Sequence, residues 1–128
     1  MKIIIETIPH KDHRYPTVGD WYYKNKTLHI KVSEMEDPRY AKLVAVHELI
    51  EVLICEHTGV TQKMVDDFDF DFEKRRKKKL VGATAEPGDD PNAPYVNEHC
   101  VATSVERLLC ALLGVNWKQY EDYLNNLP

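Results

Sequence analysis

Apolar and polar residues alternate near the start of the chain and then follow a helical period over the rest of it. Residues 2–8 form a short, isoleucine-rich run that predicts a first strand. The aromatic run 21–23 leads through a short polar connection into residues 28–32, where apolar residues alternate with His29 and Lys31. Such alternation buries one face of a strand and leaves the other in water, so a hairpin is expected here.

Helices are predicted after the hairpin. Asp37 and Pro38 form a typical helix start, an acidic N-cap followed by proline, and Gly59 provides a stop just after His57. Further helices are expected from just after Thr61, from near Tyr95 to Leu113, and from Trp117 to Leu127. This order predicts a single α+β domain over residues 1–128, in which a small antiparallel sheet packs against three to four helices.

The first predicted helix combines an apolar circumference with three ionisable residues. Leucine, isoleucine and valine cover most of its surface, which predicts a buried helix. His47, Glu48 and Glu51 nevertheless lie in its middle turns. An unpaired buried carboxylate is strongly unfavourable, so these residues need partners, a metal ion or a cleft. A hydrogen-bonded pair within the core is the structural explanation, and a metal or catalytic site is the functional one.

The spacing within this helix favours a metal site. His47 and Glu51 are one turn apart, so their side chains lie on the same face and can reach one ion. Glu48 is rotated by one position and can point toward a bound water. The third predicted helix carries His99 and Glu106 on a common side, and the two helices can face each other. Either residue can be the third ligand, and Glu106 can also be a fourth ligand or support a ligand.

The sequence HELIE (residues 47–51) resembles the H-E-x-x-H helix of zincin metallohydrolases, with glutamate in place of the second histidine. The resemblance implies a zincin-like core in which His47 and Glu51 bind the metal and Glu48 is the general base. The downstream glutamate ligand of many zincins corresponds best to Glu106. Zinc is the first expectation, but a carboxylate in place of an imidazole weakens the preference for zinc and leaves manganese and iron as alternatives.

Longer stretches of the chain resemble a family of small bacteriophage and prophage proteins that carries an HExxE helix. These stretches are RYPTVGDW (14–21), LHIKVSEM (28–35), AVHELIEVLIC (45–55), VDDFD (65–69), EPGDDPNAPY (86–95) and the segment 98–107. The resemblance covers most of the chain and implies expression inside an infected or lysogenic bacterium, and so a cytoplasmic location in the host cell. It implies no particular activity, so a function has to come from the site itself.

Composition narrows the range of partners. The formal net charge is -4, whereas proteins that bind nucleic acid or coat anionic membranes carry a clear basic excess. The basic run 74–79 follows acidic residues, as expected at a solvated helix end. Glu6 interrupts the first apolar run too early for a signal peptide, and no stretch is long enough to span a membrane. Three cysteines, an odd number within apolar helical stretches, predict reduced and mostly buried thiols.

The sequence is compatible with three functions. The leading hypothesis is a metal-binding, zincin-like protein and, in its active form, a hydrolase of a small or peptide substrate. An amide bond is favoured because the hairpin can pair with an extended peptide. The second is a magnesium-dependent nucleotide pyrophosphohydrolase that uses Glu48, Glu51 and Glu106 as carboxylate ligands. The third is a non-catalytic phage protein that binds a host protein and keeps its His/Glu cluster as part of the core.

Overall fold

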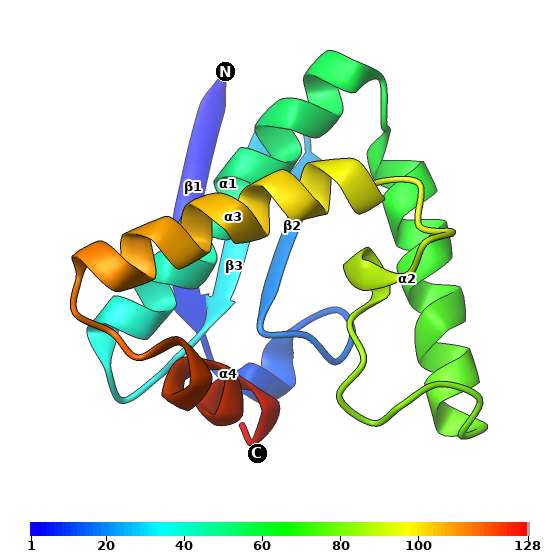
Figure 1. The fold of residues 1–128 in the computed structure, drawn as a ribbon. Coiled ribbons are helices and arrows are strands. Elements are labelled where there is room, and N and C mark those ends of the chain that lie inside the picture. Colours follow the sequence, from blue (N-terminus) through cyan, green and yellow to red (C-terminus); the bar gives the residue numbers. More distant parts are fainter. Residues whose placement is uncertain (128) are drawn as a thin grey trace.

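A computed structural model describes residues 1–127 as a three-stranded sheet with four α-helices (Figure 1). The predicted α+β class is therefore confirmed. In chain order the elements are β1 (Lys2–Ile8), the 3-10 helix η1 (His10–Asp12), β2 (Gly19–Lys24), β3 (Thr27–Ser33), α1 (Pro38–Thr58), α2 (Gln62–Lys77), the 3-10 helix η2 (Pro87–Asp89), α3 (Val96–Leu112) and α4 (Trp117–Asn125).

The sheet is mixed, so the expected antiparallel arrangement is wrong for its first strand. β2 and β3 form the predicted antiparallel hairpin, and the turn between them places Asn25 and Lys26 at positive φ. β1 instead runs parallel to β3, and the strand order is β1-β3-β2. The chain leaves β1 and passes the end of β3 before it enters β2 (Figure 1). Alternation along a sequence predicts strands, but it does not indicate which strands become neighbours.

Caps set the two ends of α1 where the sequence predicted them. The Asp37 carboxylate accepts a hydrogen bond from the N–H of Arg39 at 2.9 Å. At the other end Gly59 adopts φ 83°, a left-handed conformation that glycine reaches without strain, and its N–H bonds to the carbonyl of Cys55. Thr61 then begins α2 as its N-cap. These caps fix the two ends of α1, and its packing against the sheet and α3 decides which face turns inward.

α1 is the central element of the fold because it lies between the sheet and α3 (Figure 1). One side of α1 contacts the sheet, where Leu28, Ile30 and Val32 of β3 are buried. The other side carries His47 and Glu51 toward α3. The helix thus brings its polar residues to an interface between two layers.

Both α1 and α3 are more exposed than their apolar sequences predict. Leu53 of α1 is 59% exposed, and Leu108 and Leu112 of α3 are 61% and 74% exposed. α3 forms an outer layer and buries only one stripe, which includes Ala102 and Cys110. The sequence of α1 is apolar on most sides, so it offers little pattern from which its buried face can be chosen. The apolar character of these helices leads to the expectation that Leu53, Leu108 and Leu112 contact the core, and that expectation is wrong.

Two further expectations concern the membrane and the cysteines. Within residues 1–127 no helix has both the length and the apolar character needed to cross a membrane. The three cysteines are free, and Cys55 and Cys110 are buried as predicted, whereas Cys100 is exposed. Burial raises the pKa of the Cys55 thiol to about 12, so this group stays protonated and acts as a small apolar side chain.

Candidate metal centre

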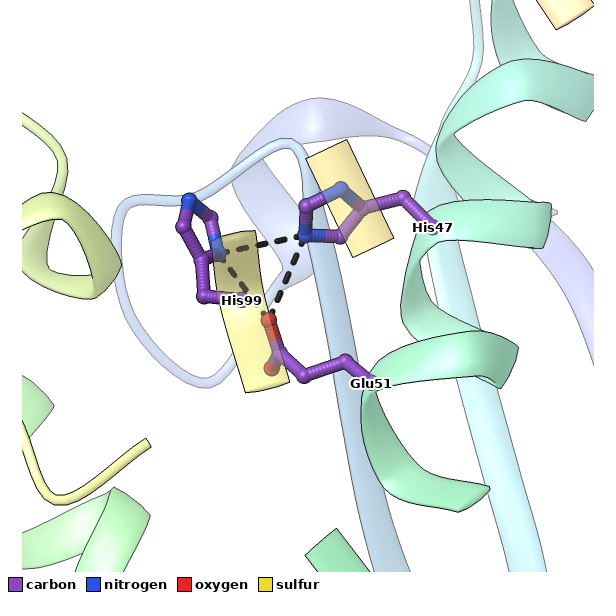
Figure 2. A group of neighbouring side chains, drawn as sticks. All are labelled: His47, Glu51 and His99. Carbon is purple, nitrogen blue, oxygen red and sulfur yellow. Dashed lines mark hydrogen bonds and ion pairs between the residues drawn. The ribbon is translucent and has the colours of Figure 1, made fainter. Parts of the chain in front are cut away.

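Three donor atoms from α1 and α3 meet inside the molecule (Figure 2). His47 Nε2 lies 3.2 Å from Glu51 Oε2 and 3.2 Å from His99 Nδ1, and these last two atoms are 3.0 Å apart. All three residues are buried. The expectation that α1 and α3 face each other through their His/Glu stripes is thus confirmed.

Helix geometry and a neighbouring strand hold the two α1 residues in place. His47 and Glu51 are one turn apart, so both side chains project toward α3 from the same face of α1. Glu51 Oε1, which does not belong to the donor triangle, accepts a hydrogen bond from Trp21 Nε1 at 3.1 Å. Both oxygens of this carboxylate are therefore fixed.

Glu106 lies behind His47 and outside the donor triangle. Its Oε1 is 2.7 Å from His47 Nδ1, and its Oε2 accepts a hydrogen bond from the buried Tyr120 hydroxyl at 2.6 Å. A carboxylate at this distance fixes the proton on Nδ1, which leaves the Nε2 lone pair directed into the triangle. Glu106 is thus placed to orient His47 rather than to be a third donor.

His99 has carboxylates near its other ring nitrogen, although that nitrogen makes no hydrogen bond like the one between His47 and Glu106. Its Nε2 lies 3.3 Å from Glu86 and 3.2 Å from Asp89, both on the loop around η2. These carboxylates favour a proton on Nε2 and so leave the Nδ1 lone pair facing Glu51. Glu86, Asp89 and His99 Nε2 also form a second group of metal-type donors, but both of its carboxylates are exposed, whereas the first group is fully buried.

The charges around the triangle favour a cation. Burial raises the pKa of Glu51, but hydrogen bonds to His47 and His99 outweigh burial and bring this pKa to about 2. Burial lowers the pKa of His99, but hydrogen bonds to Glu51 and Glu86 raise it to about 10. Burial also lowers the pKa of His47, but hydrogen bonds to Glu106 and Glu51 raise it well above its usual value. The surrounding carboxylates therefore stabilise positive charge, which either protons or a divalent ion can supply.

The dimensions of the triangle fit zinc. Donors in a tetrahedral zinc site with bonds of about 2.0–2.1 Å are about 3.3 Å apart, and the three separations here are 3.0–3.2 Å. Two imidazole nitrogens and one carboxylate oxygen are also acceptable donors for manganese and iron. The three residues line an open pocket of about 290 Å³, so a further ligand or a substrate can approach from that side.

Glu48 lines the same pocket beside the triangle. Its Oε1 lies against Gly19 of β2, so closely that a Cβ on this glycine would be only 2.6 Å away. No hydrogen bond joins the Glu48 carboxylate to another described residue. Burial, followed by repulsion from Glu51, raises the pKa of Glu48 well above its usual value. A carboxyl group of raised pKa that faces a pocket without a fixed partner is suited to proton transfer.

The rest of the pocket is strongly acidic. Asp69 of α2 is buried in its wall and accepts hydrogen bonds from the hydroxyls of Tyr15 and Tyr95, at 3.0 and 2.6 Å. Burial raises the pKa of Asp69 to about 7, although these two bonds oppose the rise. Arg76 is the pocket's one lysine or arginine within residues 1–127, and it is bonded to Glu73 and to three carbonyl groups of the loop 82–85.

Several residues of this site lie outside the sequence-based candidates. Trp21, Tyr120 and the pair Glu86 and Asp89 each hold a member of the donor set or its partner. Their roles depend on contacts between distant elements. Of these residues, the sequence hints only at Glu86 and Asp89. The prolines and acidic residues around them predict a turn, and such a turn can cover a cleft.

Gly88 provides a local test of the centre, because the η2 loop touches His99 at this glycine. A Cβ at Gly88 would lie 2.5 Å from His99 Nδ1, whereas a Cβ at Gly82 in the preceding loop would meet nothing closer than 3.7 Å. We expect Gly88→Ala to displace His99 and to weaken metal binding by at least tenfold, and Gly82→Ala to leave it unchanged. Zinc titration against a chromophoric competitor measures both variants. Equal affinities would show that His99 does not bind the metal.

The comparisons with known proteins add no relatives. No family model, no curated protein and no solved structure matches this chain. The function is therefore inferred from the donor triangle, the pocket and their charges.

Proposed function

We propose that this protein is a zincin-like, metal-dependent hydrolase in which His47, Glu51 and His99 hold one divalent ion, with zinc first and manganese or iron as alternatives. The observation that carries the proposal is the buried triangle of two imidazole nitrogens and a carboxylate oxygen, with sides of 3.0–3.2 Å. The partners behind each imidazole support it, because Glu106 and the pair Glu86 and Asp89 direct both lone pairs inward.

Each residue has a role in the proposed reaction. When bound, the metal would polarise a substrate carbonyl and lower the pKa of water. Glu48, on the pocket side of α1, takes the proton from the attacking water and passes it to the leaving group. Glu106 keeps the proton of His47 on Nδ1, and Trp21 keeps one oxygen of Glu51 away from the metal. These fixed bonds hold the donor set in place during turnover.

The charge of the pocket supports an amide or peptide substrate. A nucleotide needs free cations for its phosphates, but the described pocket has Arg76 alone, and that guanidinium is already bonded to Glu73 and to loop carbonyls. Carboxylates outnumber the basic side chains in the lining, which favours a neutral or cationic substrate. β2 is an edge strand whose residues Gly19 and Trp21 border the pocket. An extended peptide that pairs with β2 would replace the bonds that Thr17 and Gln62 now make to its backbone.

The proposed setting is the cytoplasm of a bacterial host. It rests on the expectation from the sequence that the chain is related to small bacteriophage and prophage proteins. In that setting the substrate is a small molecule or a peptide, and a host protein is a further candidate partner.

A substrate screen tests this function. Full-length protein loaded with zinc or manganese is expected to hydrolyse one or more members of a mixed peptide library, as detected by mass spectrometry. Activity should disappear with chelator and return with added metal. Nucleoside triphosphates with magnesium should stay intact. Hydrolysis of nucleotides would reject the amide substrate, and metal binding without turnover of either class would reduce the protein to a metal-binding interaction protein.

A further inference from the structure

β1 is a weakly protected edge strand. It is an outer strand in the order β1-β3-β2, and in Figure 1 it lies at the left of the sheet. Edge strands are usually protected from pairing with other chains by proline, by a bulge, by charged side chains or by an inward-pointing charge, and the charged residues of β1 are Lys2 and Glu6. Between these two residues β1 contains three consecutive isoleucines; it has no proline, and it pairs with β3 in an unbroken register over all seven residues.

The isoleucines on the helix side of β1 are only half covered. Ile3 and Ile5 are paired with Leu28 and Ile30 of β3, so all four side chains lie on the same face of the sheet. Leu28 and Ile30 are buried under α1, whereas Ile3 and Ile5 are 51% and 48% exposed. The apolar face of the sheet therefore continues past its helical cover to the open edge.

The direction of the backbone groups decides which residues face that edge. The carbonyl of Ile8 accepts a hydrogen bond from the N–H of Glu34, just past the end of β3. Ile8 therefore faces β3, and alternation along a strand directs Lys2, Ile4 and Glu6 the same way. The N–H and C=O groups of Ile3, Ile5 and Thr7 then point outward, where no strand pairs with them.

The sequence of β1 is complementary to itself in an antiparallel arrangement. When two copies are centred on Ile4, Ile3 lies opposite Ile5 of the second copy, and Lys2 lies opposite Glu6. The facing Ile3 and Ile5 are then a hydrogen-bonded pair, in agreement with their outward backbone groups. On the other face Glu6 already pairs with Lys31 of its own chain, so a second lysine completes an alternating row of charges.

We propose that two copies of this chain associate through β1, antiparallel about a twofold axis at Ile4, to form one sheet with three strands from each copy. Such an interface is self-complementary, as twofold dimers require. It covers Ile3 and Ile5, and it leaves the pocket beside β2 at the opposite edge of each sheet open. The inference is independent of the metal centre.

A cysteine placed on the axis tests the geometry. Residues on a twofold axis in a non-hydrogen-bonded pair have Cα atoms about 4.5 Å apart, within the range of about 4.4–6.8 Å that a disulfide spans. In a Cys100→Ser background, which removes the exposed thiol, Ile4→Cys should form a disulfide-linked dimer on mild oxidation. Ile3→Cys, the matched control, faces Ile5 of the second copy rather than itself and should stay mostly unlinked.

Sedimentation of the tag-free full chain provides the second measurement. At micromolar concentration the wild-type protein is expected to have a molecular mass of twice the 14.9 kDa of one chain. Ile5→Lys is expected to be monomeric and folded. Leu112→Lys makes the same change at the most exposed leucine of α3 and should remain a dimer. A monomeric wild type, or a dimer that is lost with Leu112→Lys and kept with Ile5→Lys, would overturn the β1 interface.

Discussion

His47→Ala is expected to abolish metal binding and to lower the free energy of unfolding in chelator by about 3–5 kcal/mol. The imidazole is the shared partner of Glu51 on one side and Glu106 on the other, at 3.2 and 2.7 Å. Its removal leaves the buried Glu106 without its cationic partner, leaves Glu51 with His99 as its one remaining imidazole, and opens a gap between α1 and α3. Urea denaturation in chelator measures this loss separately from the contribution of bound metal.

His57→Ala is the matched control, because it makes the same change on the same helix at an exposed position. It should keep wild-type stability and metal content. Thermal unfolding then separates the metal from the hydrogen bonds: wild type should melt at a lower temperature in chelator, whereas His47→Ala should not respond. A His47→Ala protein that is as stable as His57→Ala and still binds metal would remove His47 from the site.

Glu48→Gln is expected to lower the rate of peptide hydrolysis by about 10²–10⁴-fold, because the proton acceptor is lost while the shape of the side chain is kept. Metal content should not change, since Glu48 is not one of the three donors. The raised pKa of Glu48 means that its ionised form destabilises the fold above the usual carboxyl pKa of 4.5. At neutral pH the neutral glutamine should therefore be at least as stable as wild type.

Glu56→Gln, two turns further along α1 and exposed, serves as the control for both activity and stability. Its turnover should match that of wild type. Loss of metal in Glu48→Gln would instead make Glu48 a ligand, and full activity in Glu48→Gln would exclude it as the base. Loss of activity together with equal or higher stability is the combination that a purely structural residue does not produce.

The sequence predicts α1 and its ionisable residues well because the relevant information is local. Caps at Asp37 and Gly59 set the helix ends, and a spacing of four residues places His47 and Glu51 on one face wherever the helix lies. The stripe of α3 that carries His99 and Glu106 follows from the same period. The sequence leaves open whether His99 or Glu106 is the third ligand. The packing of α3 against α1 places His99 in the triangle and Glu106 behind His47.

Other features depend on contacts that no local pattern encodes. The parallel pairing of β1 with β3 results from the path of the chain around the end of the sheet, and the exposure of Leu108 and Leu112 on α3 depends on which elements pack against that helix. Trp21 reaches Glu51 from a strand thirty positions away. The proximity of Gly88 to His99 likewise depends on how the η2 loop folds back over α3.

Metal content is the most direct test of the central claim. Protein expressed without a tag and purified without chelator or metal-affinity resin should contain about one zinc, manganese or iron ion per chain, as measured by inductively coupled plasma mass spectrometry. Glu51→Gln and His99→Ala should each lower this content to near zero, while His57→Ala should retain it. Wild-type protein that holds no metal, even after growth with added zinc, manganese and iron, would contradict the metal centre and leave His47, Glu51 and His99 as a hydrogen-bonded core cluster.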